Sequence, residues 1–209
     1  MMQLVSDHYY AILAYLSAGG MVMVPLLVIS IIMWILIINR MFFFRRLNRK
    51  NMTREKAAQY IREDQIPDPA DYRGVIAMLV TEFQWRRTGS LNIDRHILDE
   101  TVMSVGSKLE GNLTVIGVLA KVSPLLGLLG TVTGMIATFD IISVFGAGNA
   151  RAMAGGISEA LITTQTGLMV AIPGLYAHNF LTRRAENLKR RVASVGMYLS
   201  RNLMKGQKG

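Results

Sequence analysis

The sequence predicts an all-α integral membrane protein whose three transmembrane helices extend into the cytoplasm and which assembles as a ring-forming homo-oligomer. Three long stretches lack Asp, Glu, Lys and Arg, and they lie between Asp7 and Arg40, between Lys121 and Asp140, and between Glu159 and Arg183. Each contains at least 18 mostly apolar residues, and about 20 such residues span the hydrocarbon core of a bilayer as a helix. A core helix of a soluble domain would instead repeat a polar face roughly every 3.6 residues.

The distribution of positive charge predicts how the chain crosses the membrane. The formal net charge is +9, with 14 Lys and Arg over residues 40–121, eight over 182–209 and only Arg151 between the last two apolar stretches. Cytoplasmic segments beside membrane helices carry an excess of Lys and Arg. We therefore expect a periplasmic N-terminus and 146–151 loop, with residues 41–112 and the C-terminus in the cytoplasm. The basic runs abut membrane ends, which favours contact with membrane lipids over a nucleic-acid partner.

The first two elements are residues 1–18 and 19–39. Residues 1–18 mix tyrosines with aliphatic side chains, which is typical of a helix at the outer membrane interface. Residues 19–39 are the first transmembrane helix and not a cleaved signal peptide, because the apolar run is too long and no basic residue precedes it.

Residues 40–112 are predicted to be a cytoplasmic helical segment, since charges of both signs recur at helical spacing. Pro67 and Pro69 interrupt it, because proline disfavours helix at and before its own position. We expect helices over 41–64, 73–88 and 93–112. The last should run without a break into the second transmembrane helix, since only scattered glycines lie between them.

The second and third transmembrane helices are predicted over 113–145 and 152–181, and a cytoplasmic helical tail follows over 182–209. The glycine-rich stretch 146–151 is too short for a domain, so it must join the two helices as an antiparallel hairpin. The tail should continue the third helix into the cytoplasm.

Counting inward from the hairpin turn compares the depths of the polar side chains. Thr131 lies 14 residues from Phe145 and Thr164 lies 12 residues from Ala152, which corresponds to about 21 and about 18 Å at the rise of an α-helix. The two threonines should therefore share a level near mid-membrane, within one turn. Thr133, Thr163 and Thr166 belong to the same polar slab.

Two interpretations compete for these residues. Threonine and small residues commonly serve helix packing in membranes, which would explain Gly127, Gly130 and Gly134. However, the polar side chains exceed what a hairpin needs to hold together, and a lining for water, ions or a polar partner helix explains the excess.

Glu159 differs in kind from the threonines because it carries a charge. It lies seven residues into its helix, at a depth of about 10 Å, and a carboxylate within a membrane segment costs roughly 3 kcal/mol. Helical spacing puts Glu159, Thr163 and Thr166 on one face. Either a proton pathway or a structural contact, with Arg151 or with another subunit, accounts for it.

Two motifs in this region resemble the ExbB/TolQ/MotA proton-channel family. They are "KVSPLLGLLGTVTGMIATF" (121–139) and "GGISEALITTQTGLMVAIPGLYAHNF" (155–180), in the family's order. They cover about a quarter of the chain, and the three-helix plan extends the resemblance to nearly all of it. The functional threonines of the family fall on Thr131 and Thr164, its membrane glutamate on Glu159, and its helix-kinking prolines on Pro124 and Pro173. Ser123 stands where the family has alanine.

This resemblance implies a homopentamer around the single membrane helices of a dimeric ExbD-like or TolR-like partner. An aspartate of that partner would take and release protons along the ring of threonines. An ExbB-like role, in which a TonB-like protein is energised for outer-membrane import, is the leading interpretation. A TolQ-like role in envelope constriction has the same chemistry, whereas a flagellar stator subunit would have a fourth membrane helix.

Other classes of function have less support in the sequence. A passive membrane scaffold remains as an alternative, although Glu159 and the level threonines argue against it. An enzyme would need a nucleophile and a base, and no such pair is evident. No cofactor or metal site is expected, because the chain has no cysteine and its three histidines are isolated.

Overall fold

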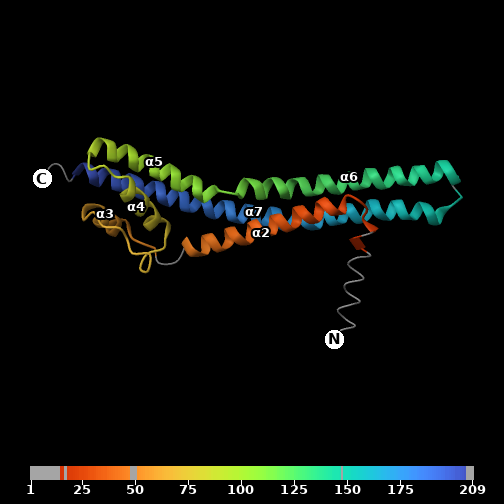
Figure 1. Ribbon diagram of the computed structural model, residues 1–209, viewed down its shortest axis with the longest axis horizontal. Coiled ribbons are helices and arrows are strands. Elements are labelled where there is room, and N and C mark those ends of the chain that lie inside the picture. The colour runs from red at the N-terminus through yellow and green to blue at the C-terminus, as the bar shows by residue number, and fades with distance from the viewer. Residues whose placement is uncertain (1–14, 17, 48–50, 147, 206–209) are drawn as a thin grey trace, which may run out of the picture. The chain divides into compact units, whose positions relative to one another are not determined.

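The computed structural model describes residues 15–16, 18–47, 51–146 and 148–205, and every regular element among them is a helix. The helices are α2 (Met23–Leu47), α3 (Arg54–Arg62), α4 (Val75–Arg86), α5 (Leu91–Glu110), α6 (Leu113–Phe145) and α7 (Ala150–Lys205) (Figure 1). The all-α class is thereby confirmed. The interfacial helix predicted over residues 1–18 lies mostly outside the described residues.

Among the described residues, three helical stretches are long and apolar enough to cross a membrane. They are Met23–Leu47, Leu91–Phe145, which contains α6, and Ala150–Leu203, with mean hydropathies of 2.3, 1.9 and 1.3 in their most apolar windows. The expectation of three transmembrane helices is confirmed on length and composition, and the chain is a multi-pass membrane protein.

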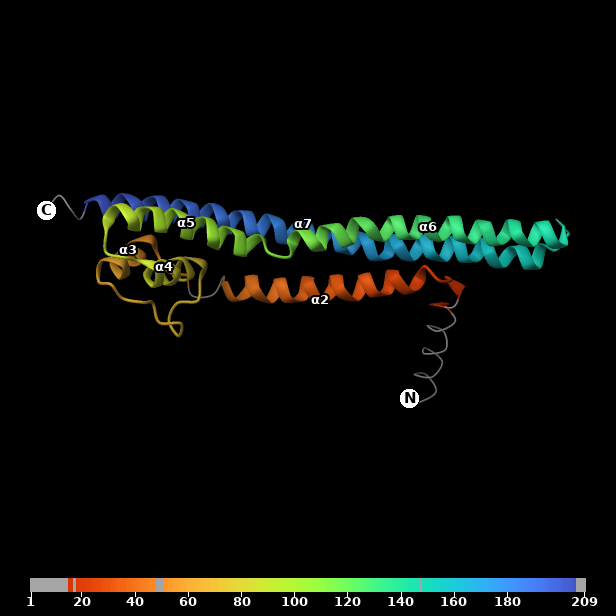
Figure 2. The same ribbon diagram turned by 45° about the horizontal axis from the view of Figure 1, so that its top comes forward.

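The chain folds as two compact units. The membrane unit consists of Met1–Ile37 and Val115–His178, and the polar unit consists of Ile38–Thr114 and Asn179–Gly209. In the membrane unit α6 and α7 lie side by side in both views (Figures 1 and 2). The continuous helix α7 contributes to both units, as the sequence predicted for the tail after residue 182.

The helix expected over 41–64 is in fact two helices. Residues 51–53 are not helical, and α3 begins only after Thr53. The Thr53 side chain accepts a hydrogen bond from the Lys56 amide at 3.4 Å. A threonine in this role satisfies an amide that has no partner within the helix, and it thereby fixes a new helix start.

The expectation that the helix over 93–112 continues into the second transmembrane helix is also wrong. α5 ends at Glu110, and Asn112 has the left-handed backbone angle φ of 61°. The Arg40 guanidinium donates to the carbonyl of Lys108 at 2.6 Å and also to that of Leu109. Carbonyls in the last turn of a helix need outside donors. Arg40, distant in sequence, supplies them and makes the break possible.

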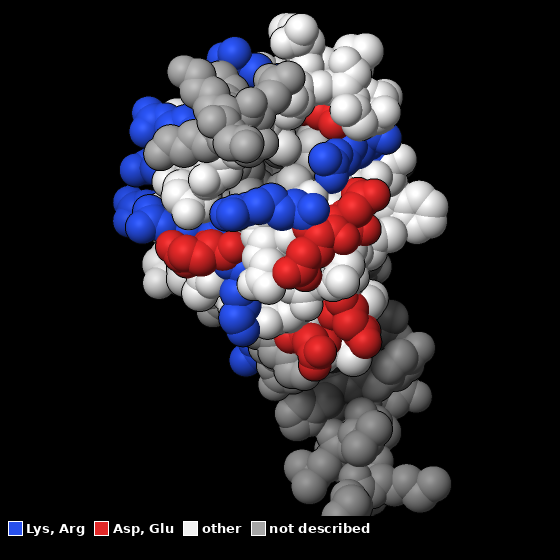
Figure 3. Space-filling view, turned by 90° about the vertical axis from the view of Figure 1, so that its left-hand side faces the viewer, with Lys and Arg blue, Asp and Glu red and all other residues white. Residues whose placement is uncertain are grey.

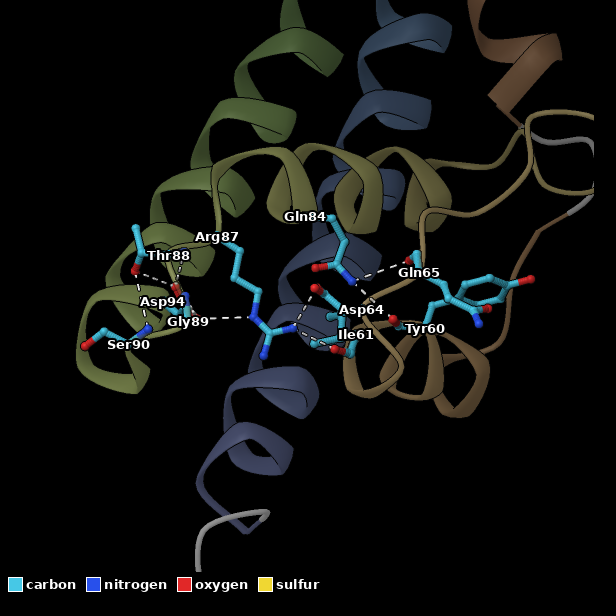
Figure 4. Close-up of polar contacts among 10 residues, drawn as sticks. All are labelled: Tyr60, Ile61, Asp64, Gln65, Gln84, Arg87, Thr88, Gly89, Ser90 and Asp94. Carbon is cyan, nitrogen blue, oxygen red and sulfur yellow. Dashed lines mark hydrogen bonds and ion pairs between the residues drawn. The ribbon is translucent and has the colours of Figure 1, made fainter.

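A buried carboxylate joins helices within the polar unit. Asp94 is 1% exposed and accepts hydrogen bonds from the Thr88 amide at 2.8 Å, the Thr88 hydroxyl at 3.0 Å, the Gly89 amide at 3.2 Å and the Arg87 Nε at 3.2 Å (Figure 4). Asp94 lies in the first turn of α5, so its side chain fixes the turn between α4 and α5.

Arg87 extends this network to α3. Its Nη1 donates to the Ile61 carbonyl at 2.8 Å and to the Asp64 carboxylate at 3.2 Å (Figure 4). Gln84 donates to the Tyr60 carbonyl at 3.1 Å. The turn after α3 is therefore held by side chains from the end of α4.

On the face in Figure 3, acidic and basic side chains lie next to one another.

Replacing Asp94 with Asn should lower the free energy of unfolding of the polar unit by about 2 kcal/mol at pH 7, because the amide cannot accept all four bonds and brings its own donors. Faster hydrogen exchange in the first turn of α5 and a lower melting temperature would report the loss. Asp99, exposed on the same helix, provides the control Asp99→Asn. An equal loss in this control would contradict the assignment.

The contribution of Asp94 should also depend on pH. Burial raises the pKa of Asp94, but the hydrogen bonds from Thr88 and Arg87 outweigh burial and hold the pKa below its ordinary value. The contribution is thus fully present above the unfolded-state pKa of about 3.9 and is lost as the pH falls through the lower folded-state pKa. Melting curves of the Asp94→Asn variant should lack this acid-dependent component.

Candidate functional site: the hairpin of α6 and α7

The two helices of the hairpin meet along a seam of small residues. The buried members of this seam are Gly127, Gly130, Gly134 and Thr138 of α6, with Gly156, Ala160, Thr163 and Gly167 of α7. They recur three or four residues apart, so each set forms one stripe along its helix. The glycines singled out in the sequence therefore lie at the contact between the two helices.

The seam brings backbone against backbone. A Cβ atom on Gly134 would lie 2.6 Å from the Gly156 carbonyl oxygen, and one on Gly167 would lie 2.8 Å from the Ser123 carbonyl oxygen. A Cβ atom on Gly127 would lie 3.1 Å from the Thr163 carbonyl oxygen. Membrane helices associate through packing and not through the hydrophobic effect, so such close approach stabilises the pair.

Thr163 lies within the seam and is fully buried. Its hydroxyl donates to the carbonyls of Glu159 at 2.9 Å and Ala160 at 3.0 Å, one turn back in its own helix. Its side chain packs against Gly130. Thr163 therefore serves the packing of α6 against α7, as the packing interpretation of the threonines expects.

Thr131 and Thr164 lie along one edge of the seam and are partly exposed. The Thr164 hydroxyl is 3.3 Å from the Gly127 carbonyl of α6 and 3.0 Å from the Ala160 carbonyl of α7. Thr131 follows Gly127 by one turn, about 6 Å along the helix, and donates to the Leu128 carbonyl at 2.6 Å. The two threonines are thus close in depth.

Helical geometry puts these two threonines on the same side of the hairpin. Each follows a seam residue by four positions, Thr131 after Gly127 and Thr164 after Ala160. Four positions correspond to about 40° of rotation past the seam. In antiparallel helices that face each other, equal rotations lead to the same side of the pair. We call this side the threonine edge.

Glu159 and Thr166 lie on the opposite side, because each precedes a seam residue by one position. Tyr15 and Gly20, which precede α2 and which we call the N-terminal segment, contact them there. The Tyr15 hydroxyl is 2.9 Å from the Thr166 hydroxyl, and Gly20 lies against the Glu159 carboxylate. Gly20 has a φ of 64°, and a Cβ atom there would collide with this carboxylate. Only glycine fits both the backbone angle and the space.

The remaining residues selected from the sequence flank this arrangement. Thr133 precedes Gly134 by one position, so it lies on the Glu159 side; it is exposed and donates to the Gly130 carbonyl at 3.0 Å. Pro124 lies inside α6 and Pro173 inside α7, and both helices continue past them. A proline leaves the carbonyl four residues earlier without its helical donor.

The sequence did not reveal the contact between the N-terminal segment and α7. The feature of the sequence that could have indicated this contact is the pair Gly19–Gly20, which allows a tight turn before α2. A Cβ atom on Gly19 would lie 3.4 Å from Ile162 of α7. Within the described part of the chain, no three His, Asp or Glu side chains gather closely enough to hold a metal ion.

Comparison with known proteins gives this hairpin a context. Residues 72–194 match the MotA/TolQ/ExbB proton channel family. A protein of Synechocystis sp. named ExbB-like 1 is 30% identical over 190 residues, which cover 87% of this chain and 74% of that protein. The biopolymer transport protein ExbB of Salmonella typhimurium is 26% identical over 187 residues, covering 83% of this chain and 77% of that protein. The Tol-Pal system protein TolQ of Pseudomonas aeruginosa is 38% identical over 81 residues, covering 39% of this chain and 35% of that protein.

Replacing Gly134 with Ala should destabilise the hairpin by about 1–3 kcal/mol, because the added methyl group overpacks the seam. The matched control is Gly155→Ala, since a Cβ atom on Gly155 meets no atom of the described residues within 4 Å. That variant should be neutral or more stable by up to about 1 kcal/mol, because alanine favours helix. Thermal melting of the purified protein distinguishes them, and equal melting temperatures would contradict the seam.

Proposed function

This chain belongs to the MotA/TolQ/ExbB proton channel family, and from this we propose that it is an inner-membrane subunit of a motor complex driven by the proton-motive force. Its membrane partner would be an ExbD-like protein with a single membrane helix, and the complex would energise a TonB-like protein for outer-membrane import. The observation that carries this proposal is the threonine edge, where Thr131 and Thr164 present hydroxyls at similar depth.

The threonine edge is suited to a carboxyl group that gains and loses a proton. A hydroxyl donates to a carboxylate and accepts from a carboxylic acid, so it can bond either protonation state. In the described residues, the hydroxyls of Thr131 and Thr164 donate only to carbonyls of α6 and α7, so their lone pairs are available to a carboxylic acid, whereas a carboxylate would take the hydroxyl hydrogen from a carbonyl. An aspartate of the partner would take a proton from the periplasmic side, pass this edge and release the proton toward the cytoplasm.

A ring of subunits follows from the polarity of this edge. Polar groups within a membrane segment face a protein interior or an aqueous path and not lipid. The N-terminal segment contacts the Glu159 side, which leaves the threonine edge for the ring's interior. We propose a homopentamer around the partner helices, with the N-terminus periplasmic and the C-terminus cytoplasmic, as the Lys and Arg distribution favours.

Glu159 has two candidate roles, carrying protons or holding the N-terminal segment. Its carboxylate lies against Gly20, and its neighbour Thr166 bonds Tyr15. These contacts support the structural role. The depth of the carboxyl group in the membrane supports the proton-carrying role.

The variants Thr131→Val and Thr164→Val should assemble normally but abolish ion-driven function, because valine offers the partner carboxyl no hydrogen bond and holds no water beside it. The measurements are growth on a substrate that requires energised uptake and purification of the complex with its partner. Serine at either position should restore part of the activity. Thr138→Val is the matched control, since Thr138 is buried in the seam and, among the described residues, bonds only the Gly134 carbonyl. A fully active Thr164→Val protein would refute the proposal.

Glu159→Gln should separate the two roles of the carboxyl group. A structural group keeps its function as glutamine, which retains the shape and can hydrogen-bond, whereas a proton carrier loses it. We expect Gly20→Ala to reduce assembly and the melting temperature in either case, because it displaces the Glu159 side chain. Gly89→Ala is its control, since Gly89 has a φ of 84° and an added Cβ atom would meet nothing within 4 Å in the part of the chain that the structure describes.

A further inference from the structure

The polar unit contains a large groove that the proposed motor function does not use. It encloses about 980 Å³ between the last turn of α2, the loop over residues 67–74 and one face of α4. We call it the α2–α4 groove. Its walls include the side chains Arg46, Tyr72, Arg73, Glu82, Trp85 and Lys108. This volume is at the upper end of what small-molecule sites enclose.

Two of the cations in the groove are already neutralised. Lys108 pairs with Glu82 at 2.7 Å, and Arg86 pairs with Glu100 at 2.5 Å. Burial raises the pKa of Glu82, but hydrogen bonds from Lys108 and Ser104 outweigh it, so the pKa lies below its ordinary value. Glu82 is therefore ionised at neutral pH and offsets the charge of Lys108.

Arg46 and Arg73 provide the excess positive charge. Neither forms a salt bridge with a residue that the structure describes. Arg73 donates from Nε to the Pro69 carbonyl at 2.8 Å, which fixes its side chain to the loop and leaves the terminal nitrogens of the guanidinium available. Two arginines on one groove favour an anionic group, since guanidinium binds phosphate through paired hydrogen bonds.

The groove also has exposed aromatic surface. Trp85 is 76% exposed although it belongs to α4, whose opposite face is buried. Tyr72 lines the same groove, and its hydroxyl accepts a hydrogen bond from Lys56 at 3.0 Å. Tryptophan and tyrosine are enriched at the level of lipid headgroups, where an apolar ring and a polar edge are both accommodated.

The position of Arg46 along α2 puts the groove at the water-facing side of the headgroup layer. The apolar run of α2 ends at Asn39, and Arg46 follows seven residues later, a distance of about 10 Å. The headgroup layer on one side of a bilayer is roughly 5–8 Å thick. The last turn of α2 therefore lies just beyond the headgroup layer, and the long side chain of Arg46 can reach back to the phosphates.

We propose that the α2–α4 groove binds the headgroup of an anionic phospholipid. Arg46 and Arg73 hold its phosphate, and Trp85 and Tyr72 pack against the polar end of the headgroup. This site is independent of the threonine edge and of the motor function. A lipid is favoured over an acidic peptide because the groove combines excess positive charge and an exposed tryptophan with a position beside the headgroup layer.

The test uses the fluorescence of Trp85 in a Trp34→Phe background, since the chain has two tryptophans. The purified full-length protein, stripped of lipid in neutral detergent, is titrated with short-chain phosphatidylglycerol and, separately, with phosphatidylcholine. We expect a saturable change with phosphatidylglycerol only. Arg46→Gln and Arg73→Gln should each weaken binding about tenfold, the loss expected for a charge-assisted hydrogen bond.

The control is Arg95→Gln, which removes an exposed arginine of the polar unit outside the groove and should leave binding unchanged. Melting temperatures establish that each variant is folded. Arg73→Lys keeps the charge without the paired geometry and should retain part of the affinity. Equal binding of phosphatidylcholine, or unchanged binding in both glutamine variants, would overturn the proposal. Displacement of phosphatidylglycerol by a soluble polyglutamate peptide at a comparable concentration would also overturn it, in favour of an acidic-peptide site.

Discussion

The membrane unit depends on the close backbone approach of α6 and α7. At Gly134 and Gly156 the two helices leave no space for a side chain on either glycine. Because lipid offers no hydrophobic gain for helix association, this contact must come from packing. It fixes the rotation of each helix about its own axis, and that rotation decides where every polar side chain of the hairpin lies.

One consequence is that the polar residues separate into three groups. Thr163 lies in the seam and bonds its own helix, whereas Thr131 and Thr164 lie along one edge and Glu159 lies on the other side. The Glu159 side is in contact with the N-terminal segment through Gly20. A polar slab that looks uniform along the sequence therefore has distinct sides, and in the ring that we propose only the threonine edge would face the partner helix.

The polar unit depends on a different constraint, the satisfaction of backbone groups where helices end. Arg40 supplies donors to the last carbonyls of α5, and Asp94 accepts from amides in the turn before α5. The long-range contact of Arg40 explains why α5 and α6 are separate, whereas the predicted helix over 41–64 divides before the local N-cap of Thr53. Local composition had suggested continuity, since neither Asn112 nor Thr53 is a strong breaker by itself.

The sequence by itself determined the three apolar helices, the hairpin, the similar depth of Thr131 and Thr164 and the resemblance of its two motifs to the channel family. These properties depend on length, hydropathy and helical rise, which are local. The tertiary structure decided which glycines meet backbone, that Thr163 belongs to the seam, and that Gly20 lies against Glu159. It also brought Arg46 and Arg73 to one groove. Such contacts depend on the relative rotation of segments distant in the chain, and neither periodicity nor composition specifies that rotation.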